Sequence, residues 1–302
     1  MSTLRAWIQA ARLPSQSYIA LPLILGQVLA WHATGLWSWP IFVIVALFGI
    51  FDQFYIVFAN DYADRETDAL NETSTVFSGG SRVLVEGRIS SKALFRAALL
   101  MAALATATGI ALLVGWENVL VLPLVLIGLA LLWAYSFGPL RMSYRGGGEF
   151  LQMLGVGLVL PLIGYAAQAG DLSLFPLEVL AFLLPLNLAT SLCTALPDEP
   201  SDRISQKRTL PVILGGKTVR LVIIALNLVG LTLFAILAFP ALEGLSWSLE
   251  ALLALPAISV VGQAFTAKHA VAGTGSILAF IFFSLFCNLS LVALLITGLA
   301  VS

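Results

Sequence analysis

The chain has 302 residues, of which 60% are hydrophobic and 10% are charged, and its mean hydropathy is +0.99. Soluble globular domains contain about 45–50% apolar and about 25% charged residues, so this composition indicates a polytopic membrane protein. The formal net charge of -1 excludes a nucleic-acid-binding protein that depends on a strongly basic surface. The two cysteines, Cys193 and Cys287, lie in apolar stretches and exclude a disulfide framework and a thiolate metal site.

Nine apolar runs follow one another along the chain. Because a membrane-spanning helix needs about 20 apolar residues, they predict an all-α fold with nine transmembrane helices in one domain, 1–302. The segment 1–14 carries Arg5, Trp7 and Arg12 without a small-residue cleavage site, so we expect an interfacial helix and not a removed signal peptide. The predicted spans are 17–33, 39–59, 93–114, 119–137, 150–169, 176–195, 218–239, 249–267 and 276–299.

The distribution of lysine and arginine predicts the orientation of the chain, because short loops rich in these residues stay in the cytoplasm. With nine spans and a cytoplasmic N-terminus, all 15 basic residues fall on one side of the membrane, and the loops on the other side contain none. We therefore expect an integral protein of the plasma membrane, with its N-terminus and its basic loops in the cytoplasm and its C-terminus outside.

The aspartates are concentrated in two long cytoplasmic connections. Five of the seven Asp form two clusters, the first with i, i+3, i+7 spacing and the second with i, i+4 spacing. Residues at either spacing share one face of a helix. Long ordered loops are often functional, so both connections are candidate sites. The first connection, 60–92, contains Asp61, Asp64 and Asp68, and the second, 197–217, contains Asp198 and Asp202.

Five carboxylates gathered at one end of the bundle would repel one another unless cations neutralised them. Oxygen ligands suit Mg²⁺, which proteins commonly hold with a few carboxylates and substrate phosphates. Such a site beside an apolar bundle fits a prenyl diphosphate, because Mg²⁺ and basic groups would stabilise the departing diphosphate while an electron-rich acceptor attacks the allylic carbocation. The five Asp are the predicted metal-binding and catalytic residues. The predicted substrate-binding residues are Asn60, Arg82, Arg141, Arg145, Lys207 and Arg208.

These motifs resemble the UbiA superfamily of intramembrane prenyltransferases. Asn60 and the first three Asp match its signature N-D-x-x-D-x-x-x-D, and the last two Asp match D-x-x-x-D. The stretches 77–84, 139–146 and 207–212 look most like the 1,4-dihydroxy-2-naphthoate polyprenyltransferase branch. The resemblance implies a nine-helix enzyme that uses Mg²⁺ to transfer a polyprenyl group from a prenyl diphosphate to this aromatic acceptor, with loss of CO₂, in menaquinone or phylloquinone synthesis.

Several alternatives stay open from the sequence. The stretch 194–197 and Gln206 differ from the naphthoate branch, so 4-hydroxybenzoate, haem, a chlorophyllide and a glycerol phosphate lipid are alternative acceptors. A cation transporter that uses the Asp clusters is the alternative from another class, although transporter sites generally lie near the bilayer midplane. Asp52, inside the second span, and Glu149, at the start of the fifth, have either a functional or a structural role. The sequence gives no oligomeric state.

Overall fold

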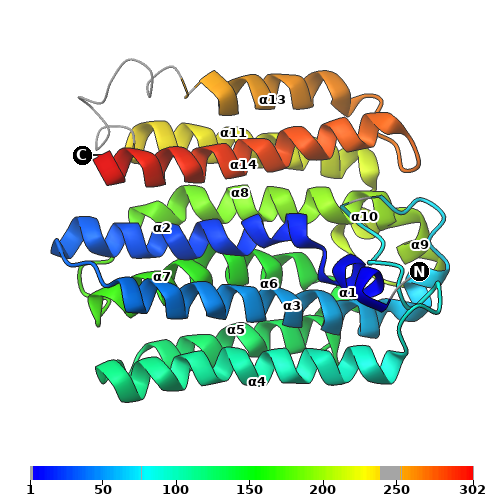
Figure 1. The fold of residues 1–302 in the computed structure, drawn as a ribbon. Helices are drawn as coiled ribbons and strands as arrows, with labels where there is room; N and C mark the ends of the chain where they lie inside the picture. The colour runs from blue at the N-terminus through cyan, green and yellow to red at the C-terminus, as the bar shows by residue number, and fades with distance from the viewer. Residues whose placement is uncertain (1–2, 76, 239–251, 253, 302) are drawn as a thin grey trace.

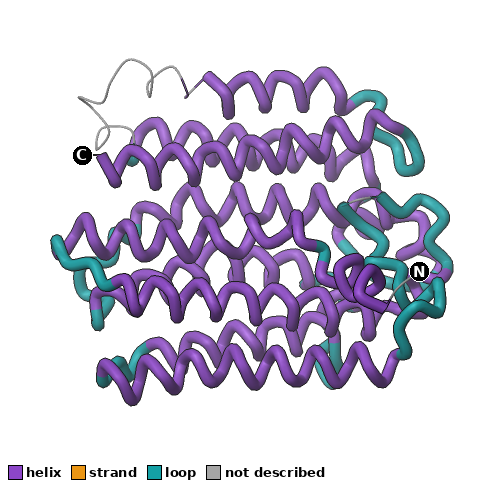
Figure 2. Tube along the Cα trace, viewed as in Figure 1, coloured by secondary structure: helices purple, strands orange, loops and turns teal. Residues whose placement is uncertain are grey.

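The structure is a computed structural model, which describes the chain except for residues 1–2, 76, 239–251, 253 and 302. The regular elements of this described part are helices (Figure 2). Figure 1 shows the long helices running side by side as one bundle, with the short helices α9 and α10 at one end. The predicted all-α fold is confirmed.

Loops join the helices at both ends of the bundle, and the connection between α3 and α4 is a long one (Figure 2). One long rod is interrupted in its middle by a π-helical turn, η3, and three 3-10 turns lie next to α-helices. In chain order the elements are α1 (Thr3–Ala11), η1 (Leu13–Ser15), α2 (Gln16–Thr34), α3 (Trp39–Ala69), α4 (Ser91–Trp116), α5 (Val121–Ser136), η2 (Met142–Tyr144), α6 (Gly148–Leu154), η3 (Gly155–Val159), α7 (Leu160–Ala169), α8 (Glu178–Ala195), η4 (Leu196–Asp198), α9 (Glu199–Ile204), α10 (Leu210–Leu214), α11 (Gly216–Leu237), α13 (Ala254–Ala267) and α14 (Gly275–Val301).

The described residues contain seven helical stretches that are long and apolar enough to cross a membrane. The apolar helices α5 and α13 are shorter, with 16 and 14 residues. Together these helices overlap all nine predicted spans, but part of the span 249–267 lies outside the described residues. The count of nine transmembrane helices therefore stays a prediction.

Local sequence signals mark several helix ends. Pro40 lies in the first turn of α3, where its missing N–H breaks no helical hydrogen bond. The Ser90 hydroxyl accepts a hydrogen bond from the backbone N of Ala93 at 3.3 Å and caps the start of α4. Gly35 ends α2 with a φ of +70°, a left-handed conformation that glycine adopts readily.

The helix α3 is longer than the predicted span, which we ended at Ala59. It continues to Ala69, so the first part of the connection 60–92, which carries the first Asp cluster, is helical. The residues become polar at Asn60, but no glycine or proline follows before Gly79, and nothing in the sequence stops the helix there. The polar residues thus mark where the apolar part of the rod ends and not where the helix ends.

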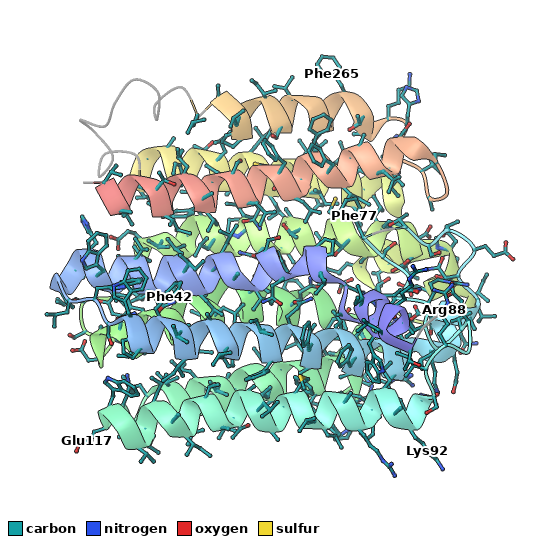
Figure 3. All side chains as sticks on the ribbon, in the orientation of Figure 1. Phe42, Phe77, Arg88, Lys92, Glu117 and Phe265 are labelled. Carbon is teal, nitrogen blue, oxygen red and sulfur yellow. The ribbon has the colours of Figure 1, made fainter. Side chains whose placement is uncertain are left out.

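One end of the bundle, which we call the motif end, carries α9, α10 and both Asp clusters. The backbone N of Arg208 donates to the carbonyl of Tyr144 at 3.3 Å, and Gly273 lies beside the Thr73 side chain, so loops distant in sequence meet here. Figure 3 places Arg88 and Lys92 at the motif end and Glu117 at the other. The N-terminal helix lies at the motif end and the end of α14 lies at the opposite one (Figure 1).

Close backbone contact joins α2 to α7 in the middle of the bundle. A methyl group on Gly26 would collide with the carbonyl oxygen of Pro161 and would lie 2.8 Å from the backbone N of Tyr165. A methyl group on Gly164 would collide in the same way with the carbonyl oxygen of Leu23. Small residues at such crossings let membrane helices pack backbone to backbone. The crossing fixes the core on which the motif end is built.

Candidate active site

The first Asp cluster occupies the last turns of α3. Asp61, Asp64 and Asp68 lie on its buried face, with exposed fractions of 3%, 5% and 9%. The predicted placement of the three carboxylates on one helix face is confirmed, and Asn60 is half-buried beside them. Burying an ionised carboxylate without a partner is costly, so the groups that contact these acids determine what the site can do.

The second cluster lies where α8 gives way to two short helical turns. Asp198 ends η4 and Asp202 belongs to α9, so this segment is helical as the i, i+4 spacing required. Pro200 is in the first turn of α9, where proline is tolerated. The loop after α3 reaches this cluster, because the amide of Asn71 donates to Oδ1 of Asp198 at 2.7 Å and the backbone N of Gly79 donates to Oδ2 at 3.2 Å.

Lys207 lies between the two clusters and joins them. Its Nζ is 2.9 Å from Oδ2 of Asp64 and 3.7 Å from Oδ1 of Asp202, and its side chain is 9% exposed. Burial by itself lowers the pKa of Lys207, but the attraction of the two carboxylates is stronger and raises this pKa above its ordinary value. The Lys207 ammonium is therefore charged. It partly neutralises the carboxylates of Asp64 and Asp202, one from each motif.

Tyr144, in the η2 turn between α5 and α6, supports this bridge with its aromatic side chain. The Tyr144 hydroxyl donates to Oδ1 of Asp64 at 3.1 Å and lies 2.9 Å from the hydroxyl of Thr67. The Lys207 ammonium is 4.9 Å from the centre of the Tyr144 ring, within the range of a cation–π contact. Burial and the nearby Asp64 charge raise the pKa of Tyr144, so its hydroxyl keeps the proton that it donates.

The N-terminal segment supplies a second cation. Arg12, which follows α1, forms an ion pair with Asp61, and the backbone N of Ser81 donates to both oxygens of the same carboxylate at 3.2 Å. The Nε of Arg12 is buried and has no acceptor within the described part of the chain. One donor of this guanidinium is therefore buried without a partner among the described residues.

The role of Arg12 at the site could not be predicted from the sequence. We predicted Arg12 to lie in an interfacial helix, and 49 positions separate it from Asp61. The contact arises because α1 folds back over the connection after α3, where the amide of Gln9 donates to the carbonyl of Ser81 at 2.7 Å. No local pattern reveals such a contact. The hydroxyl and amide partners Tyr144, Ser81 and Asn71 were missed for the same reason.

Asp68 is packed against a glycine. Gly80 has a φ of +70°, and a methyl group on it would collide with Oδ2 of Asp68 and would lie 3.4 Å from Oδ1 of Asp61. Within the described residues, no hydrogen bond or ion pair ends on the Asp68 carboxylate. Of the three acids on α3, Asp68 is therefore the one without a hydrogen-bonding or ion-pair partner in this part of the chain.

The predicted substrate-binding arginines surround this site in different ways. Arg82 donates to the backbone carbonyls of Asp68 at 2.9 Å and Asn71 at 3.0 Å, where it satisfies the end of α3. The Arg141 guanidinium lies 3.6 Å from the centre of the Tyr144 ring at the rim. Arg145 and Arg208 are exposed near them. Of the six predicted residues, Lys207 lies deepest in the site.

The two carboxylates with open roles have different surroundings. Glu149 is buried, and its Oε1 accepts a hydrogen bond from the backbone N of Leu210 at 2.7 Å. Its Oε2 has no hydrogen-bond partner among the described residues. Asp52 is buried farther along α3 from the motif end and takes no part in the clusters. Glu149 thus joins α6 to α10 beside the site, and Asp52 belongs to the bundle interior.

The comparison with known proteins decides the family. The model of the UbiA prenyltransferase family matches residues 19–286 of the chain. The protein belongs to the UbiA prenyltransferase family. This match covers both Asp clusters, confirms the family predicted from the motifs, and makes the chain a prenyltransferase that is integral to a membrane.

Individual relatives agree with this membership. The chain is 26% identical over 220 residues to a 2-carboxy-1,4-naphthoquinone phytyltransferase from Synechocystis sp., which covers 72% of this chain and 68% of the relative. Its fold is similar to a UbiA homologue from Archaeoglobus fulgidus bound to GPP and Mg²⁺, with a TM-score of 0.69 and 16% identity over 98% of this chain and 99% of that one. An apo UbiA homologue from Aeropyrum pernix K1 has a TM-score of 0.65 and 19% identity over 94% and 97% of the two chains.

The donors of this UbiA protein suit a hard divalent cation, because the clustered side chains present carboxylate oxygens and no sulfur or imidazole. Across the residues that the structure describes, however, no three acidic or imidazole groups converge on one position that would hold a metal ion. The reason is visible in the contacts: Arg12 holds Asp61, Lys207 holds Asp64 and Asp202, and Asn71 holds Asp198. The chemistry of the site fits Mg²⁺, while other groups of the chain contact four of the five carboxylates.

Proposed function

We propose that the protein transfers a polyprenyl group from a prenyl diphosphate to an aromatic acceptor in a Mg²⁺-dependent reaction, and that the acceptor is 1,4-dihydroxy-2-naphthoate in menaquinone or phylloquinone synthesis. The observation that carries the proposal is the meeting of both Asp clusters at the motif end through Lys207. The similarity to a naphthoquinone phytyltransferase supports this choice of acceptor. The solved UbiA homologue with bound GPP and Mg²⁺ supports the choice of donor and metal.

In this proposal the five clustered Asp hold Mg²⁺ and, with it, the diphosphate. When bound, Mg²⁺ would neutralise the negative charge that develops on the leaving diphosphate. Lys207 and the arginines at the rim bind phosphate oxygens and keep the head group at the motif end. Asn60 orients the first cluster. The residues concerned are Asp61, Asp64, Asp68, Asp198 and Asp202 for the metal, and Asn60, Arg82, Arg141, Arg145, Lys207 and Arg208 for the substrate.

The prenyl tail lies along the apolar helices below the clusters. Breaking the bond between C1 of the prenyl group and the diphosphate oxygen leaves an allylic cation, and a new carbon–carbon bond forms between C1 and the acceptor ring. With 1,4-dihydroxy-2-naphthoate the prenyl group replaces the carboxylate, so CO₂ leaves and its bonding electrons remain in the ring. The bundle excludes water that would otherwise capture the cation.

We further propose that the motif end faces the cytoplasm of the cell and that the C-terminus lies outside. All 15 basic residues fall on the predicted cytoplasmic side. Loops that carry them meet at the motif end, as the contact between Arg208 and Tyr144 exemplifies. Positively charged loops resist transfer across the membrane, and this supports the orientation.

The test is a turnover assay on the purified chain with radiolabelled geranyl or longer prenyl diphosphates, with Mg²⁺ or EDTA, against a panel of acceptors. We expect Mg²⁺-dependent labelling of 1,4-dihydroxy-2-naphthoate. Labelling of 4-hydroxybenzoate or another acceptor alone would contradict the proposed acceptor but not prenyl transfer. Equal labelling in EDTA would contradict the role of the metal.

Variants of the clustered acids test the site itself. Asp61→Ala and Asp198→Ala each remove a carboxylate from one motif, and we expect turnover to fall by about 100-fold or more, as when one preorganised electrostatic group is lost. Asp171→Ala is the matched control, because Asp171 is exposed in the α7–α8 connection and contacts Ser173 only locally. Wild-type turnover in both cluster variants would overturn the proposed site.

A further inference from the structure

The chain's own cations contact the acids that the proposed metal would need. Lys207 lies between Asp64 and Asp202, one from each motif. Arg12 occupies Asp61. Three of the five clustered carboxylates are therefore paired with cations from the connection after α9 and from the N-terminal segment. A divalent ion that bound the same oxygens would lie within a few ångströms of a positively charged side chain.

Coulomb repulsion makes that arrangement unstable. Like charges a few ångströms apart repel strongly inside a protein, where the effective dielectric constant is far below that of water. The Lys207 ammonium sits on a flexible four-carbon stem that can move aside without moving the backbone. A departing diphosphate group, with its several negative charges, offers both cations a new partner at the same place.

The unpaired donor of Arg12 is a second reason to expect a diphosphate at this place. Its Nε is buried and has no acceptor within the described residues, while another nitrogen of the guanidinium holds Asp61. Arginine binds phosphate in a two-pronged geometry that uses two of its N–H groups together. The Arg12 side chain is 26% exposed, so it can turn toward a ligand.

Resting on the function proposed above, we propose that Lys207 and Arg12 are exchangeable counter-ions. Each holds its carboxylate while the site is empty of substrate, and each passes to a diphosphate oxygen when the divalent cation takes the carboxylate. This adds Arg12 and the N-terminal segment to the substrate site. It also means that the metal alone competes with the two cations for the acids, whereas diphosphate, bound with the metal, gives the two displaced cations a new partner.

The consequence is a coupling between the two ligands. Diphosphate binding draws the cations away and so raises the affinity for the metal, and the metal raises the affinity for diphosphate by the same factor. Coupling between two sites is typically about 5- to 150-fold in affinity. Removing one of the cations should change the two affinities in opposite directions, which a merely structural role would not do.

The experiment measures Mn²⁺ binding by electron paramagnetic resonance on the purified full chain, with and without geranyl diphosphate and without acceptor. For the wild type we expect geranyl diphosphate to tighten Mn²⁺ binding at least about fivefold. In Lys207→Met we expect tighter Mn²⁺ binding without diphosphate, weaker binding of geranyl diphosphate and a smaller coupling. Lys207→Arg keeps the positive charge and should behave as the wild type.

Lys217→Met is the matched control for Lys207→Met, because Lys217 is exposed in the first turn of α11 at the same end of the bundle. Arg12→Gln is an independent second variant, since the Arg12 side chain is partly exposed and its loss leaves Asp61 bound to Ser81. Arg5→Gln, on the exposed side of α1, is its control. Both controls should keep the wild-type Mn²⁺ affinity and coupling.

The outcomes separate this inference from the proposed function. If the wild type binds neither Mn²⁺ nor geranyl diphosphate, the proposed function fails and the exchange fails with it. If the wild type binds both ligands but Mn²⁺ affinity without diphosphate is equal or lower in Lys207→Met and Arg12→Gln, the exchange alone is overturned. Tighter Mn²⁺ binding with weaker diphosphate binding in these variants supports it.

Discussion

A single glycine shows how closely the acids are packed at the residue scale. Gly80 and Gly87 both adopt left-handed backbone conformations, with φ of +70° and +64°, so alanine at either position costs about 1–2 kcal/mol of backbone strain. Only at Gly80 does the new methyl group meet neighbours, the carboxylates of Asp68 and Asp61; at Gly87 it meets open space. The two positions therefore separate backbone strain from disturbance of the acids.

We expect Gly80→Ala to abolish most prenyl transfer and to weaken Mn²⁺ binding, because Asp68 must move away from its place on α3. We expect Gly87→Ala to keep prenyl transfer and Mn²⁺ binding close to wild type, at a thermal stability similar to that of Gly80→Ala. Turnover and Mn²⁺ titrations of the two purified variants provide the measurement. Equal losses in both variants would show that loop strain, and not the Asp68 contact, is responsible.

Glu149 gives a second prediction at this scale. Its Oε1 accepts a hydrogen bond from the backbone N of Leu210, the first residue of α10. Glu149→Ala leaves that buried donor without a partner, at a cost of about 1–3 kcal/mol, so the unfolding temperature in detergent should fall by several degrees. Glu149→Gln keeps an acceptor at Oε1 and should retain the wild-type unfolding temperature. A similar decrease in both variants would assign the effect to the charge and not to the hydrogen bond.

At the scale of elements, the crossing of α2 and α7 is the tightest contact in the bundle interior. Gly26→Ala would push the methyl group into the backbone of α7 at Pro161, and backbone cannot move aside as a flexible side chain does. We expect a loss of about 1–3 kcal/mol, the cost of overpacking, seen as a lower unfolding temperature and less folded protein in the membrane. Gly115→Ala, which meets open space in α4, is the matched control and should be stable.

The elements also show what sequence patterns can and cannot predict. The spacing of Asp61, Asp64 and Asp68 predicts one helix face, because helical periodicity depends only on neighbours in the chain. The end of α3 could not be predicted from polarity, since the helix has no stop signal where the apolar residues end. Arg12 and its partner Asp61 could not be paired from the sequence, because the contact depends on how α1 folds back across the loop.

For the whole molecule, the charge pattern predicts the orientation of the bundle in the membrane. The segregation of Lys and Arg into alternate connections agrees with a bundle in which these connections meet at the motif end. The same pattern could not distinguish a positive-inside signal from substrate binding, because both place basic residues in the same loops. Side-chain contacts place Lys207 between two acids, whereas Arg145 and Arg208 stay at the surface.

The opposite placement of the two chain ends has a practical consequence for reconstitution. The helix α1 lies at the motif end, whereas the end of α14 lies at the opposite end of the bundle (Figure 1). A protease-cleavable affinity tag fused after α14 therefore leaves the motif end unobstructed. In sealed liposomes, cleavage of this tag reports the orientation of the protein in the membrane. With the orientation proposed above, the fraction of tag removed by external protease equals the fraction of enzyme whose motif end faces the lumen, where added prenyl diphosphate does not reach it.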